Sequence, residues 1–172
     1  MYTYLLDTYK ENDLTYDRYN KGKLEAQLAY HGNYKAYFEF IADSLKRYSS
    51  QRDKQKGEAF VHGFTLAMTS QNQFYRPISE LDNDGGYADI FLSPLCDIYK
   101  DMMDCYIIEL KYCKTNTADE QLQVLFKEAS AQICRYANSD IVKESVKTTK
   151  LHKLVVIYRG AEMVMCEEVT EK

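Results

Sequence analysis

The fold is decided by Tyr106-Ile107-Ile108-Glu109-Leu110-Lys111, an apolar run that two charged residues interrupt. A run that is apolar on both sides of a strand is typical of a central strand in a sheet that helices cover. Side chains alternate along a strand, so Glu109 and Lys111 share one face while Leu110 points to the other. Because burying an unpaired charge is costly, we expect neighbouring structure to supply partners for both charged residues.

A second strand, Tyr87-Ala88-Asp89-Ile90-Phe91-Leu92, precedes this one and carries a carboxylate at the matching depth. In an antiparallel hairpin centred near Tyr99, residues whose numbers sum to 198 are opposite each other, which pairs Asp89 with Glu109. Two carboxylates about 5 Å apart repel each other, and a bridging divalent cation removes that repulsion. The hairpin therefore predicts a metal site. The alternative is a Lys–Glu ion pair on a solvated face, with Asp89 as a turn residue.

The rest of the chain indicates an α/β fold with a mixed sheet. We expect a turn at Tyr19–Gly22, and helical spacing over 23–48 is broken at Gly32-Asn33. After the polar stretch 49–57 we expect a helix at 58–68 and then three strands, at 74–80, 87–93 and 105–113. A Thr117/Glu120 capping box then predicts the start of a second helix, which runs to Ala137. Two further strands are expected at 153–158 and 163–169. The strand–helix–strand order favours a parallel crossover. We therefore divide the chain into an N-terminal helical extension, 1–56, and an α/β domain, 57–172.

The composition of the chain excludes some classes of function and favours others. The chain has 172 residues and a net charge of −4, and residues 58–118 hold nine Asp/Glu against four Lys/Arg. Such a surplus is unfavourable for sequence-independent binding to duplex phosphates. It suits either a hard divalent cation or a solvated acidic face. Five scattered cysteines without a C-x-x-C pair, and three histidines far apart, favour reduced thiols over a zinc site.

No apolar run approaches the roughly 20 residues that a membrane span needs, and charged residues in 1–16 argue against a signal peptide. We therefore expect a cytoplasmic protein that does not contact a membrane. No phosphate-binding Gly-x-x-x-x-Gly-Lys-Ser/Thr loop occurs, so we expect no ATPase activity in this chain.

The ordered residues resemble the PD-(D/E)XK nuclease superfamily, whose signature is an acidic residue on one strand and acidic-x-Lys on the next. Asp89, Glu109 and Lys111 match that signature, and Ala88 stands where the family usually has proline. The resemblance covers about residues 33–169. Its matching stretches, 57–64, 86–90 and 128–133, look like the nuclease-like domain found behind an AAA-ATPase-like region in many bacterial proteins. It implies a restriction-endonuclease-like α-β-β-β-α-β core with a mixed central sheet.

The resemblance also implies roles for individual residues. Asp89 and Glu109, with the Leu110 carbonyl, would ligate Mg²⁺ or Mn²⁺, and Lys111 would orient the attacking water or stabilise developing charge. Glu58 matches an acidic residue that many members place beside the metal. The other reading of Glu58 is an exposed carboxylate at a helix N-terminus.

Gln132 and Tyr136 match the Gln-x-x-x-Tyr element of the exonuclease branch. The other reading of Gln132 is a polar residue at the edge of an apolar stripe. His62, one turn after Glu58, either faces the same cleft or packs in the core.

The resemblance implies a metal-dependent phosphodiester hydrolase, a nuclease acting on DNA. The alternative is a catalytically weak or inactive module through which an AAA-ATPase-like protein docks on a partner or a nucleic acid. The tyrosine-rich first 50 residues would suit contact with such an ATPase region, or with a second copy of the chain in a homo-oligomer.

Overall fold

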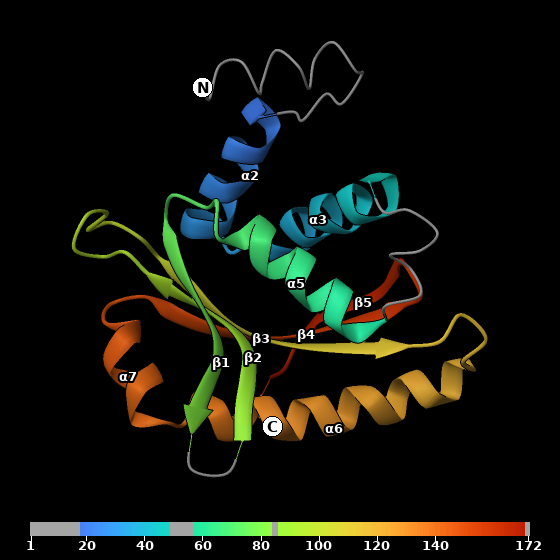
Figure 1. Cartoon of the computed structure of the whole chain (residues 1–172). Helices are drawn as coiled ribbons and strands as arrows, with labels where there is room; N and C mark the ends of the chain where they lie inside the picture. The colour runs from blue at the N-terminus through green and yellow to red at the C-terminus, as the bar shows by residue number, and fades with distance from the viewer. Residues whose placement is uncertain (1–17, 49–56, 84–85, 171–172) are drawn as a thin grey trace.

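A five-stranded mixed sheet forms the centre of the protein. The computed structural model describes residues 18–48, 57–83 and 86–170. The strands lie in the order β1-β2-β3-β4-β5 (Figure 1). They are β1 (Tyr75–Asn83), β2 (Gly86–Pro94), β3 (Asp104–Cys113), β4 (Lys150–Arg159) and β5 (Glu162–Glu168). The β3–β4 pair is parallel and the other three pairs are antiparallel, which confirms the mixed sheet and the parallel crossover.

Helices cover both faces of the sheet, as the continuous apolar run in β3 predicted (Figure 1). One face packs against α2 (Arg18–His31), α3 (Tyr34–Tyr48) and α5 (Glu58–Thr69), and the other packs against α6 (Asp119–Ala137) and α7 (Asp140–Val146). Alternation along β3 sends Tyr106 to the first face and Ile107 to the second. The N-terminal helices thus share one core with the sheet, and Tyr106 Oη donates to the Leu28 carbonyl of α2 at 2.7 Å.

The β2–β3 hairpin has the predicted register. Its paired residues are Ile90 with Ile108, Phe91 with Ile107, and Leu92 with Tyr106, and each pair of numbers sums to 198. The pairing stops at Ile90, so Asp89 and Glu109 lie just beyond the last pair, where the two strands separate.

Two predictions from local sequence are wrong, because contacts with distant residues determine the structure there. Tyr19–Gly22 lies inside α2 and is not a turn, because buried Lys21 pairs with Glu25 one helical turn on and donates to the Gln71 carbonyl. The capping box is also wrong, since no side chain caps α6. Arg159 instead donates to the Thr117 carbonyl at 3.1 Å and to Asp119 at 2.7 Å, which holds the start of α6 against the end of β4.

Helix α7 was not predicted, although Ser139 caps it by accepting from the Val142 amide. The expected polar stretch 49–57 lies outside the described residues except for Gly57. Among the described residues, no helix is both long and apolar enough to cross a membrane.

Candidate functional site

Asp89 lies where β2 separates from β3. Its carboxylate accepts the hydrogen bond that the β3 backbone would otherwise donate to the backbone of β2. Oδ2 accepts a hydrogen bond from the Leu110 amide at 2.7 Å. In a strand, the N–H and C=O of one residue point to the same side. The Leu110 carbonyl therefore lies on the side of β3 from which Asp89 approaches, and this edge of β3 presents both a carboxylate and a carbonyl oxygen.

Glu109 is the most unusual residue of the site, because a carboxylate is buried with one oxygen unpaired. Its side chain is 3% exposed, and Oε1 accepts from Lys111 Nζ at 2.8 Å. Oε2 is buried and has no hydrogen-bond partner. Buried polar atoms in folded proteins are nearly always satisfied, so an orphaned carboxylate oxygen calls for a ligand or a functional reason.

Negative charge exceeds positive charge around Glu109, which favours the binding of a cation. Burial raises the pKa of Glu109 to about 7, the negative charges of Asp89 and Glu58 add to the rise, and the hydrogen bond from Lys111 opposes it. Burial also acts to lower the pKa of Lys111, but the hydrogen bond and charge of Glu109, with the charges of Asp89 and Glu58, raise it above its usual value. Lys111 is therefore a stable ammonium group, while Glu109 lacks sufficient positive charge nearby.

Helix α5 contributes two residues near the two acids. Glu58 is exposed at the first position of α5, and its charge acts on both Glu109 and Lys111. His62, one turn later, is half-buried, and its Nε2 lies 3.1 Å from the Asp89 carbonyl oxygen. His62 therefore contacts the backbone of the strand that carries Asp89 and is not fully buried in the core.

Gln132 and Tyr136 both lie on α6, the helix that covers the second face of the sheet. Tyr136 is buried in the apolar cluster with Ile107, and Gln132 is half-buried. Within the described residues, neither one hydrogen-bonds to Glu109 or Lys111. Their assignment to the site stays a prediction from the resemblance.

The residues present fit one divalent cation held by few protein ligands. The fit rests on the unpaired Glu109 Oε2, a second carboxylate on Asp89 and hard oxygen donors throughout, which suit Mg²⁺ or Mn²⁺. Among the described residues, no three His, Cys, Asp or Glu side chains come together in a group that could hold a metal. The structure thus brings Asp89 and Glu109 together and does not gather Glu58 with them as a third ligand.

A second buried charged cluster was not predicted from the sequence. His152 of β4 has Nε2 2.8 Å from Asp104 Oδ1 and Nδ1 2.9 Å from Glu168 Oε1. Its ring stacks on Tyr106 with centroids 5.0 Å apart. The sequence signal was present, since His152 immediately precedes the predicted strand 153–158, but nothing local identified its partners on β3 and β5.

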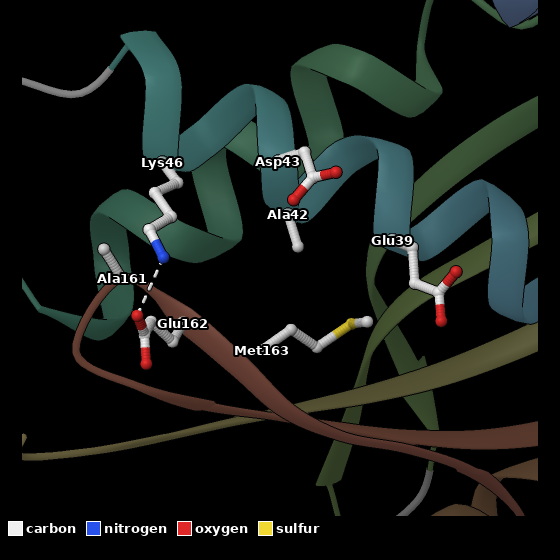
Figure 2. Close-up of a pocket in the computed structure, with 7 residues that line it drawn as sticks. All are labelled: Glu39, Ala42, Asp43, Lys46, Ala161, Glu162 and Met163. Atoms are coloured by element: carbon white, nitrogen blue, oxygen red, sulfur yellow. Dashed lines mark hydrogen bonds and ion pairs between the residues drawn. The ribbon is translucent and has the colours of Figure 1, made fainter.

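One groove lies away from both clusters. Its volume is about 370 Å³. Figure 2 shows the residues that line it, on α3 and at the start of β5. Ala42, Ala161 and Met163 contribute its apolar part, and Lys46 Nζ pairs with Glu162 Oε1 at 2.8 Å across it. Neither Asp89 nor Glu109 lines this groove.

Comparison with known proteins identifies the family of this chain. The family model of the PD-(D/E)XK nuclease superfamily matches residues 56–168, well over half of the chain. No curated protein and no solved structure matches the chain. The matched segment holds α5, the whole sheet and α6, and with them Asp89, Glu109 and Lys111 in the order and register described above. On this evidence the chain belongs to the PD-(D/E)XK nuclease superfamily.

Proposed function

We propose that the protein is a metal-dependent phosphodiester hydrolase that cuts DNA at the site formed by Asp89, Glu109 and Lys111. The observation that carries the proposal is the buried, unpaired Oε2 of Glu109 beside a second carboxylate. Both oxygens of a buried structural carboxylate typically have partners, whereas a cation ligand keeps one oxygen for the cation.

Each residue has a separate task in this proposal. Asp89 and Glu109, with the Leu110 carbonyl, would hold Mg²⁺ or Mn²⁺. The bound ion would polarise a phosphate oxygen and lower the pKa of a water molecule. Lys111 stays charged, is 21% exposed and is fixed by Glu109, so its ammonium group can orient the attacking water or stabilise charge that develops on the phosphate.

The test is cleavage of plasmid and single-stranded DNA with Mg²⁺ or Mn²⁺. Asp89→Asn keeps a carbonyl oxygen for the Leu110 amide but removes the charge, and Glu109→Gln and Lys111→Met remove the other two charges. We expect each variant to lose on the order of 100-fold or more in cleavage rate, and EDTA to abolish cleavage by the parent.

Matched controls come from the ion pair at the groove, Lys46–Glu162, which is far more exposed than the pair at the site. Lys46→Met and Glu162→Gln repeat the same chemical changes away from the site and should cleave like the parent. Cleavage that survives all three site substitutions, or that persists in EDTA, would rule out this function.

A second candidate is the docking module, in which the domain binds an AAA-ATPase-like partner or nucleic acid and cleaves weakly or not at all. The absence of a three-residue metal group among the described residues favours it, as does the acidic surplus over 58–118. Calorimetric titration with Mn²⁺ separates the two, because a docking module has no need of a cation between Asp89 and Glu109. Saturable Mn²⁺ binding that Glu109→Gln removes supports the hydrolase.

A further inference from the structure

His62 connects helix α5 to the strand that carries Asp89. The two buried hydroxyl groups of α5 donate within their own helix: Thr65 donates to the Val61 carbonyl and Thr69 to the Leu66 carbonyl. His62 instead reaches β2, with Nε2 3.1 Å from the Asp89 carbonyl oxygen. A carbonyl can only accept, so Nε2 carries the proton and donates it.

Asp89 lies beyond the last β2–β3 pair, while its own strand stays paired with β1 on both sides of it. The β2–β3 pairing stops at Ile90, and from there the Asp89 carboxylate bonds the Leu110 amide at 2.7 Å. The carboxylate is thus fixed by β3 and the backbone carbonyl by α5. Together with the pairing of β2 to β1, these two contacts hold the residue from which the carboxylate points.

We propose that His62 is a positioning residue that holds Asp89 against Leu110 and beside Glu109, so that the two carboxylates can share one divalent cation. This role rests on the proposed function, since it concerns the same pair of carboxylates. His62 acts through the Asp89 backbone and is given no contact with metal or substrate.

The first test needs no metal. Amide hydrogen exchange of Leu110 is measured in the metal-free parent, in His62→Leu, which cannot donate, and in His62→Gln, whose amide can. We expect Leu110 to exchange about tenfold faster in His62→Leu, because loss of the anchor frees Asp89 to leave the amide, and to return towards the parent rate in His62→Gln.

Two controls separate positioning from general stability. Thr65→Val removes a buried hydrogen bond from the same helix and should leave Leu110 exchange unchanged. The Val155 amide, in the centre of β4, reports global opening. The proposal is overturned if Leu110 exchange is unchanged in His62→Leu, if Leu110 and Val155 accelerate together, or if His62→Gln gives no rescue.

The second test is the dissociation constant for Mn²⁺ by calorimetry. Residues that orient metal ligands typically contribute 10- to 100-fold in affinity, so we expect about tenfold weaker binding in His62→Leu and near-parent binding in His62→Gln. If the parent binds no Mn²⁺, the proposed function fails while the exchange result on His62 stands. If the parent and His62→Leu bind equally well, the positioning role fails alone.

Discussion

Strand β3 carries two buried acidic clusters, and they differ in how completely their polar atoms are paired. At its start, on the face covered by α2 and α3, Asp104 bonds His152, which also bonds Glu168. About five residues further along, on the face covered by α6, Glu109 bonds Lys111 through one oxygen and leaves the other without a partner.

The difference fits a structural role for the first cluster and the proposed cation site for the second. Both nitrogens of His152 have carboxylate partners, and its ring stacks on Tyr106, so nothing further is required there. A buried carboxylate oxygen that lacks a partner destabilises the protein until something binds it. Proteins retain such local instability mainly at functional sites.

The largest expected effect on stability comes from breaking the first cluster. His152→Leu removes the ring that both carboxylates contact and leaves Asp104 buried without it. Removing one partner from a buried pair costs several kcal/mol, and we expect the free energy of unfolding to fall by about 3 kcal/mol. That value is at the low end of the usual range because the Glu168 side chain remains 27% exposed. Urea unfolding measures the change.

The control for this substitution is His31→Leu, the same change at an exposed histidine at the end of α2, which should alter stability little. His152→Leu should also leave Mn²⁺ affinity within twofold of the parent, since the cluster lies on the other face of the sheet. A stability equal to that of the parent would show that His152 does not hold the cluster together.

The second cluster should make the free energy of unfolding depend on pH. The pKa of Glu109 rises from 4.5 to about 7 on folding. The folded protein therefore binds more protons than the unfolded chain between these values, and stability falls as pH rises through this window. Glu109→Gln cannot ionise, so it should gain about 2 kcal/mol relative to the parent between pH 5 and pH 8. Urea unfolding in EDTA at both pH values measures this difference.

Glu162→Gln is the matched control, because Lys46 lowers the pKa of Glu162 and that group stays ionised throughout the same window. Its stability relative to the parent should not change between pH 5 and pH 8. Adding Mn²⁺ at pH 8 should stabilise the parent and not Glu109→Gln. A pH-independent difference for Glu109→Gln would mean that Glu109 is not strained in the folded protein.

The contrast between the clusters also shows what a sequence can predict. Asp89, Glu109 and the register of 198 followed from local rules, because a hairpin joins strands that are close in the chain and alternation fixes which side chains share a face. Such rules do not reach from Asp104 to His152, which lies 48 positions later in the chain. That contact depends on how a parallel crossover sets β4 against β3, which periodicity does not determine.

The errors have the same origin. Lys21 sits in a helix because Glu25 and the Gln71 carbonyl pair with it, and the second of these is 50 residues away. The start of α6 is held by Arg159, 40 residues after Asp119, and not by the nearby capping pair. Local patterns thus predicted the type of most elements, while distant polar partners decided where individual elements begin.

The smallest expected effect is at Gly32, where the corner between α2 and α3 meets the first cluster. Its φ of 63° favours glycine, and an added Cβ would lie 3.6 Å from the His152 ring, an ordinary contact. Gly32→Ala should therefore cost about 1 kcal/mol from backbone strain alone and leave Mn²⁺ binding unchanged.

Gly22→Ala, inside α2 with nothing within 4 Å, should instead stabilise the protein. Urea unfolding of both variants checks the opposite signs, and a loss of Mn²⁺ affinity in Gly32→Ala would show that the two clusters on β3 are coupled.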